Sequence, residues 1–223
     1  MSKKLFLSAI IKFTAGVILV GALIFLPAGT LRFPGGWLLM GILFVPMFLA
    51  GLVMMAKDPN LLRSRLNAKE KEADQDLVVK LSGLMFLTGF ILAGLDFRFG
   101  WSALPMAVNY VGAALFLTAY ALYAEVLREN AWLSRTIEVQ EGQTVVSTGL
   151  YGIVRHPMYA VTLLLFLSMP LVLGSIPAFV VFLSYPAIIA RRILGEERVL
   201  SRDLPGYKEY LEKVRWRLIP YIW

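Results

Sequence analysis

The chain has 223 residues, of which 58% are hydrophobic and 17% charged, and its mean hydropathy of +0.70 excludes a soluble globular domain. It has no cysteine and a single histidine, so the sequence excludes disulfides and thiolate chemistry and argues against a zinc site. The net charge of +7 is compatible with nucleic-acid binding, but the positions of the basic residues, described below, exclude that class.

In chain order, the apolar blocks predict helices over 5–28, 36–57, 78–97 and 103–127, followed by a helical hairpin of 157–173 and 176–195. Each block approaches the roughly 20 residues that a membrane-spanning helix needs, and backbone inside lipid must be helical. The first block is too long for a signal-peptide core, so it is expected to be retained. We therefore expect an all-α integral membrane protein with five to six transmembrane helices.

The expected hairpin has a turn marked by Pro170, Gly174, Ser175 and Pro177. Its arms are short, so it either spans the membrane fully or only dips into it. In both cases the two ends of the hairpin, near His156 and Gly195, lie on the same side.

The Lys and Arg residues concentrate at the N-terminus, in the loop 57–80, in 128–155 and in the tail, whereas the alternate loops hold only Arg32 and Arg98. By the positive-inside rule, this asymmetry predicts a multi-pass protein of the inner (plasma) membrane with both termini in the cytoplasm. The basic surplus is then topogenic, and it is not a footprint for nucleic acid.

Three stretches are expected on the cytoplasmic side. Residues 58–66 have helical spacing at the interface and lead into a mixed-charge run, Lys69 to Asp76. Residues 136–147 suggest a small β-hairpin with a turn at Gly142. In the tail, apolar residues at helical spacing predict an amphipathic helix, which either anchors the tail to the membrane or caps a site: Tyr207, Tyr210, Leu211 and Val214.

The first polar cluster surrounds the single histidine. Arg155 and His156 precede Pro157, which suits the first turn of a helix, and a helix N-terminus attracts anions. Tyr151 and Tyr159 offer rings for stacking or hydroxyls for hydrogen bonds. The alternative is that Arg155 anchors the helix at the headgroups and His156 packs in the interior.

The second cluster lies at the far end of the hairpin. Arg192 and Glu196 are four residues apart on one helix face, and Glu197 follows directly. Acidic residues at a helix C-terminus are disfavoured by the helix dipole, so they suit a bound cation; the alternative is that they are solvated charges. Taken together, the two clusters favour a zwitterionic ligand with an aromatic base, such as an amino acid joined to a nucleoside.

These motifs resemble a known superfamily. The run Gly149-x-Tyr151-x-x-Val154-Arg155-His156-Pro157-x-Tyr159, an apolar hairpin, Glu196-Glu197-x-x-Leu200 and Pro205-Gly206-Tyr207-x-x-Tyr210 are similar to the isoprenylcysteine carboxyl methyltransferase and phospholipid methyltransferase superfamily of membrane enzymes. The resemblance is strong over residues 128–223. It implies S-adenosylmethionine as the cofactor, a cofactor-binding region at 128–223, and a scaffold at 1–127 that shapes the acceptor pocket.

The resemblance also implies individual roles. Arg192 matches the arginine near the reacting carboxylate, and Arg192 and Glu196 are the candidate catalytic residues. Val161 departs from the family pattern, which often has glycine there, and is expected to narrow the space for cofactor or substrate. The candidate cofactor-binding residues are Gln143, Thr144, Val145, Val146, Tyr151, Arg155, His156, Pro157, Met158, Tyr159, Glu196 and Glu197.

The expected function is methylation of a lipophilic acceptor that enters from the bilayer, with a carboxylate preferred over an amine and with no metal or nucleic acid as partner. Methyl transfer depends mainly on positioning. A carboxylate needs no general base, whereas an amine would lose its proton to Glu196 or Glu197. Alternatives are phospholipid or amine N-methylation, an NADPH-dependent membrane reductase of related fold, and a non-catalytic lipid-binding or scaffold protein.

Overall fold

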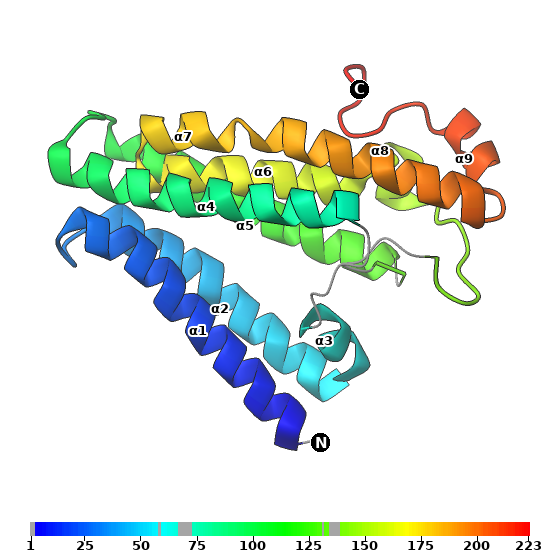
Figure 1. Ribbon diagram of the computed structural model, residues 1–223, viewed down its shortest axis with the longest axis horizontal. Helices are drawn as coiled ribbons and strands as arrows, with labels where there is room; N and C mark the ends of the chain where they lie inside the picture. Colours follow the sequence, from blue (N-terminus) through cyan, green and yellow to red (C-terminus); the bar gives the residue numbers. More distant parts are fainter. Residues whose placement is uncertain (1–2, 58, 67–72, 131, 134–138) are drawn as a thin grey trace.

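The computed structural model describes the chain except for residues 1–2, 58, 67–72, 131 and 134–138 (Figure 1). The described part consists of helices and connecting loops, without a strand. Its elements are α1 (Lys3–Ala28), α2 (Pro34–Lys57), α3 (Pro59–Leu66), α4 (Ala73–Phe99), α5 (Met106–Glu129), the 3₁₀ helix η1 (Gly149–Gly152), α6 (Pro157–Leu173), α7 (Ile176–Phe182), α8 (Tyr185–Asp203) and α9 (Tyr207–Lys213).

Among the described residues, five segments are long and apolar enough to cross a membrane: Lys4–Ala28, Pro34–Lys57, Asp76–Phe99, Met106–Glu129 and Ile176–Asp203. Helix α6 is also apolar but has only 17 residues, about 25 Å of helix against a hydrocarbon core of about 30 Å. The expected all-α membrane architecture is confirmed, and the helix limits differ from the predicted ones by only a few residues at most ends.

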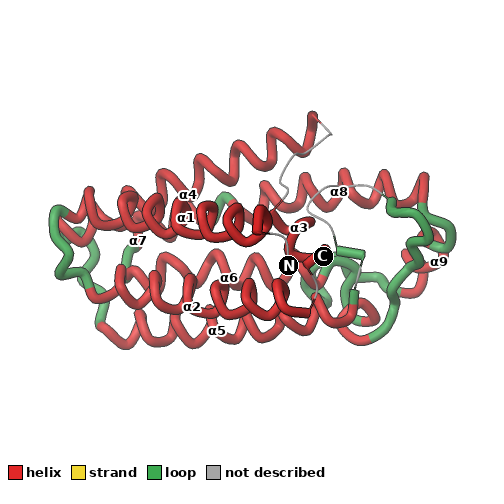
Figure 2. Tube along the Cα trace, turned by 90° about the horizontal axis from the view of Figure 1, so that it is seen from below, coloured by secondary structure: helices red, strands yellow, loops and turns green. Residues whose placement is uncertain are grey.

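The long helices run side by side, and the bundle has two distinct ends (Figures 1 and 2). One end carries the connections α1–α2, α4–α5 and α6–α7, and is called the turn end. The other carries α3, α9 and the chain segments around η1, and is called the pocket end. The α1–α2 pair lies at an angle to the other helices and is closest to them at the turn end (Figure 1).

Helices pack closely where glycine permits it. A Cβ atom on Gly112 of α5 would lie 2.7 Å from the backbone nitrogen of Val172 in α6, and one on Gly94 of α4 would lie 2.5 Å from the carbonyl oxygen of Ile24 in α1. Small residues at such contacts are how membrane helices gain van der Waals contact, because lipid supplies no hydrophobic drive for association. The first contact fixes α5 against α6, the two helices that lead into the pocket end, and the second fixes α4 against α1.

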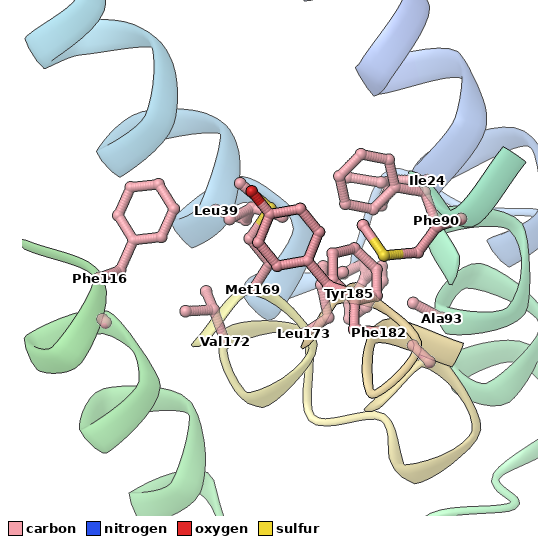
Figure 3. Close-up of a cluster of buried hydrophobic side chains, with 14 of the residues drawn as sticks. Ile24, Leu39, Phe90, Ala93, Phe116, Met169, Val172, Leu173, Phe182 and Tyr185 are labelled. Atoms are coloured by element: carbon pink, nitrogen blue, oxygen red, sulfur yellow. The ribbon is translucent and has the colours of Figure 1, made fainter. Parts of the chain in front are cut away.

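The main core is formed by residues of α1, α2, α4, α5, the hairpin of α6 and α7, and α8 (Figure 3). Phe182 fits against Gly89 and forms edge-to-face or tilted ring contacts with Phe86 and Phe90. Tyr185, at the start of α8, is part of the same cluster, so the helix that carries the second polar cluster is anchored in this core.

The second arm of the expected hairpin is interrupted. Helix α7 ends at Phe182 and α8 begins at Tyr185, with Pro186 in its first turn. Proline has no N–H to continue the hydrogen-bond ladder, which explains the break. Beyond it α8 continues to Asp203, eight residues past the predicted end, and so reaches the pocket.

The expected β-hairpin is only partly within the described residues. Gln143 N donates to Gln140 O at 3.1 Å across the turn at Glu141 and Gly142, and residues 139–147 contain no strand. Residues 136–138 lie outside the described residues, as does the first half of the mixed-charge run from Lys69 to Asp76, whose second half belongs to α4.

Candidate functional site

A pocket opens at the pocket end, between α5, α6, α8, the 139–147 segment and α9, and its empty volume is about 800 Å³ including the mouth open to solvent. The residues that line it are Asn130, Trp132, Leu133, Gln143, Thr144, Val145, Val146, Tyr151, Arg155, His156, Met158, Tyr159, Arg192, Glu196, Leu200, Leu204, Tyr207 and Tyr210.

The turn before α6 is shaped by Gly149. Its φ of +53° lies in the left-handed region, and a Cβ atom there would overlap the carboxylate of Glu129 at the end of α5. That carboxylate accepts a hydrogen bond from Leu150 N at 2.9 Å. The contact fastens η1 to α5 and thereby directs Tyr151 into the pocket.

His156 lies between the two glutamates of α8. Its Nε2 is 3.3 Å from Oε1 of Glu197, and its Nδ1 is 3.9 Å from Oε2 of Glu196, which is too long for a hydrogen bond. The imidazole stacks on Tyr159 with ring centroids 5.7 Å apart. His156 is thus buried and also lines the pocket, so the packing role and the site role coexist in one side chain.

The adjacent glutamates have different surroundings. Glu197 is buried, and its carboxylate accepts hydrogen bonds from Arg155 Nη1 at 3.0 Å and from Arg217 Nε at 2.8 Å. Glu196 lines the pocket, whereas Glu197 does not. Because successive residues on a helix point about 100° apart, only one of the two can face the pocket.

Arg155 is engaged with the protein itself. Besides Glu197, its guanidinium donates to the carbonyl oxygens of Val214 at 2.6 Å, Leu211 at 3.2 Å and Arg215 at 3.1 Å. These carbonyls lie at and just beyond the end of α9. Arg155 therefore holds the C-terminal segment against the start of α6.

Arg192 and Tyr159 meet on another wall of the pocket. Arg192 Nε donates to the hydroxyl of Tyr159 at 3.0 Å. Glu196 lines the same pocket one turn further along α8. The pocket thus presents a guanidinium and a carboxylate on one helix face, next to an aromatic ring.

Three buried polar atoms of the pocket have no hydrogen-bond partner within the described part of the chain: the hydroxyls of Tyr151 and Tyr207 and Oε2 of Glu196. The Tyr151 hydroxyl lies near the Asn130 side chain without reaching hydrogen-bond geometry. Burial raises the pKa of Tyr151 and of Tyr207, so both hydroxyls are neutral donors at physiological pH. Unsatisfied buried polar groups are rare in folded proteins, and their convergence fits a polar ligand.

The tail contributes to the pocket. The buried face of α9, Tyr207, Tyr210 and Val214, packs with Leu204 against Val145 and other residues of the pocket rim. The Tyr210 hydroxyl donates to the carbonyl oxygen of Tyr151 at 2.7 Å. Of the two roles left open for the amphipathic helix, the structure places its apolar face on the pocket.

Most of the residues expected from the sequence line this pocket, with the exception of Pro157 and Glu197. Val161 does not line it either: it is buried beside Ala119 and Val126 of α5. The lining residues that no sequence motif included are Asn130, Trp132, Leu133 and Leu204. Of these, Trp132 could have been predicted, because it is an aromatic residue in the segment that directly follows α5.

Comparison with known proteins gives two findings. Residues 107–204 match the family model of phospholipid methyltransferases. A segment of 91 residues is 30% identical to Delta(14)-sterol reductase of Mus musculus; it covers 40% of this chain and 22% of the reductase, so the chain spans about a fifth of that relative's length.

The family match covers α5 from its second residue through α8, the helices that carry Tyr151, His156, Arg192 and Glu196. It thereby confirms the superfamily indicated by the motifs. Over residues 107–204, a little under half of its length, this multi-pass membrane protein is similar to the phospholipid methyltransferase family.

Proposed function

We propose that the pocket binds S-adenosylmethionine and that the protein transfers its methyl group to a lipophilic acceptor, with a carboxylate as the accepting group. The observation that carries the proposal is the convergence of Tyr151, Tyr207 and Glu196 in one pocket, each with a buried polar atom that has no partner among the described residues. Tyr151 and Glu196 lie in the segment that matches a methyltransferase family, and Tyr207 lies three residues beyond it. In this proposal residues 128–223 form the cofactor region, and 1–127 form the scaffold and acceptor pocket.

The pocket residues suit the parts of such a cofactor. The free oxygen of Glu196 would hold the cationic amino group of the methionine part, a charge-assisted contact. The hydroxyls of Tyr151 and Tyr207 would donate to its acceptor atoms. The 143–146 segment, Met158 and Trp132 would enclose the nucleoside, for which Trp132 and Tyr159 offer aromatic surface.

The cofactor, when bound, supplies a methyl group on a positively charged sulfur. The protein's part is to bring the nucleophile into line with that methyl group, which accounts for several kcal/mol of rate acceleration in well-oriented reactions. Arg192 would orient an acceptor carboxylate by charge-assisted hydrogen bonds, and its contact with Tyr159 holds the guanidinium in place. A carboxylate is already ionised at neutral pH, so no general base is needed.

The cofactor assignment is tested by calorimetry with S-adenosylhomocysteine on the purified protein and on Glu196→Gln. The variant should bind at least about tenfold more weakly, because it replaces a charged acceptor by a neutral amide. Glu212→Gln, an exposed change on α9, is the matched control and should bind like the parent protein. Absence of binding to the parent, or equal binding by Glu196→Gln, contradicts the assignment.

The acceptor class is tested by incubating membranes with a cofactor that carries a labelled methyl group. A methyl ester releases labelled methanol on mild alkaline treatment, whereas an N-methyl group keeps its label. Alkali-labile product supports the carboxylate acceptor. Alkali-stable product supports amine methylation, in which Glu196 would accept the proton lost by the amine.

A second candidate function rests on the similarity to the sterol reductase. In that case the pocket would bind NADPH, and the protein would reduce a double bond of a lipophilic substrate. Thermal unfolding in detergent distinguishes the two: stabilisation by NADPH and none by S-adenosylhomocysteine would favour the reductase, and the reverse result would exclude it.

A further inference from the structure

Arg217 lies in the C-terminal tail, outside the motifs of the cofactor site, yet it contacts the buried carboxylate of Glu197. Its Nε donates to Oε2 of Glu197 at 2.8 Å. The other oxygen of Glu197 is occupied by Arg155 and faces His156. Glu197 therefore joins three segments of the chain: the start of α6, helix α8 and the tail.

The backbone of the tail follows the same line of contacts. Arg155 N donates to Trp216 O at 2.8 Å, and His156 N donates to Arg217 O at 2.9 Å. Together with the Arg155 guanidinium bonds to carbonyls at the end of α9, these contacts hold the segment 211–217 against the residues that precede α6. Of these side-chain contacts, the one that Arg217 makes is the ionic link from the tail to α8.

The tail also holds Arg217 itself in position. The N–H groups of Arg217, Leu218 and Ile219 converge on the main-chain oxygen of Trp223 at 2.9–3.2 Å, and the Arg217 guanidinium lies over the Trp223 ring at 5.4 Å. Trp223 in turn packs against the main core. Arg217 is thus presented to Glu197 by a closed loop of the tail, and little ordering is left to be done when the ion pair forms.

The ion pair of Arg217 with Glu197 lies next to the pocket and affects one of its walls. The held segment 211–217 directly follows Leu204, Tyr207 and Tyr210, which form one wall of the pocket and supply the Tyr207 hydroxyl that has no partner among the described residues. We propose that Arg217 is a positioning residue, which holds this wall in place through Glu197 so that Tyr207 faces the bound cofactor. The proposal rests on the proposed function only for the identity of that cofactor.

A positioning role predicts a particular pattern for Arg217→Ala. Loss of the Arg217 side chain leaves Oε2 of the buried Glu197 without its donor, which favours release of the tail. Amide hydrogen exchange, measured by mass spectrometry in detergent, should speed up in residues 204–218. The dissociation constant for S-adenosylhomocysteine should rise by at least about tenfold. Because Arg217 touches no reacting atom, kcat at saturating cofactor should fall by less than about threefold, and the loss should fall on KM for the cofactor.

Two further variants make the test specific. Lys213→Ala removes an exposed basic side chain from the same segment and should change neither exchange nor affinity. Arg217→Lys keeps one donor for Glu197 and should recover part of the cofactor affinity. If Arg217 only stabilised the folded tail, cofactor affinity would not vary from Arg217 through Lys to Ala. Arg217→Lys also keeps the test informative if Arg217→Ala proves too unstable to purify.

Each outcome decides. Faster exchange with weaker cofactor binding, graded through Arg217→Lys, supports the positioning role. Faster exchange with unchanged affinity overturns the inference that the tail forms the cofactor wall, and weaker binding with unchanged exchange overturns positioning in favour of direct contact with the ligand. If the parent protein binds no S-adenosylhomocysteine, the proposed cofactor is wrong, and the exchange difference alone still decides whether Arg217 holds the tail.

Discussion

The two ends of the helix bundle treat their buried polar groups in opposite ways. At the turn end, the buried Asp96 accepts hydrogen bonds from the backbone N and the hydroxyl of Ser102, both at 2.7 Å, and Ser102 Oγ also accepts from Ile176 N. At the pocket end, Tyr151, Tyr207 and Glu196 keep buried polar atoms without partners in the described residues. Asp96 and Ser102 thus find their partners within the protein, whereas the three groups at the pocket end leave polar atoms available to a ligand.

This difference separates stability from binding. A buried polar group with all its hydrogen bonds made within the protein stabilises the folded state. A buried polar group whose partner is a ligand lowers the stability of the ligand-free protein. Variants at the turn end should therefore lower stability and spare ligand affinity. Variants of the unsatisfied groups should change affinity with little loss of stability, or even with a gain.

The largest effect is expected from Gly112→Val at the contact of α5 and α6. The new side chain meets the backbone of Val172, which cannot move without displacing α6, so unfolding should become easier by about 3 kcal/mol or more. Reversible unfolding in detergent measures this loss. Gly83→Val is the matched control, because a Cβ atom at Gly83 meets nothing within 4 Å. An equal effect of the two substitutions would contradict the close packing described here.

A smaller loss is expected from Asp96→Ala. It removes two hydrogen bonds and leaves the Ser102 backbone N–H without its acceptor, so stability should fall by roughly 2–3 kcal/mol. Asp96→Asn keeps an acceptor oxygen and should cost less. Affinity for S-adenosylhomocysteine should stay unchanged in both. A change in affinity would show that the two ends of the bundle are coupled and that the turn end also affects ligand binding.

The smallest effects come from a matched pair on α9, and their signs differ. Tyr210→Phe loses the hydrogen bond to Tyr151 O and should lower stability by about 1 kcal/mol. Tyr207→Phe removes a buried hydroxyl that has no partner in the described part of the chain, and should raise the stability of the ligand-free protein by roughly 0.5–1 kcal/mol while weakening ligand binding. Unfolding with and without S-adenosylhomocysteine measures both. Loss of stability in Tyr207→Phe would mean that its hydroxyl is satisfied in the free protein.

The sequence predicted the helices well, because apolar blocks of membrane length leave the backbone no other structure. It also brought His156 and Glu196 to one end of a hairpin. It did not predict the break before Tyr185, although Pro186 was a visible cause, or the extension of α8 to Asp203.

The sequence could not separate Glu196 from Glu197. Which of two adjacent residues faces the pocket depends on the rotation of α8, and that rotation is set by packing at distant positions such as Tyr185 and Ile189. Arg217 was missed for a related reason: its partner lies 20 residues away on another element, and no spacing rule connects them. The family pattern named residues that occur together at this site, and the contacts distinguish those that face the pocket from those that hold it.

The length of α8 has a consequence for the proposed reaction. Arg192 and Glu196 lie on one uninterrupted helix, about 6 Å apart along its axis. In the proposed roles, Arg192 binds the acceptor and Glu196 binds the cofactor. The helix therefore sets the distance between the methyl donor and the group that receives the methyl. Acceptors of different shape must then be accommodated by the surrounding walls of the pocket. A single residue inserted between Arg192 and Glu196 would rotate one side chain by about 100° around the helix axis relative to the other. Such an insertion should abolish methyl transfer even where both ligands still bind.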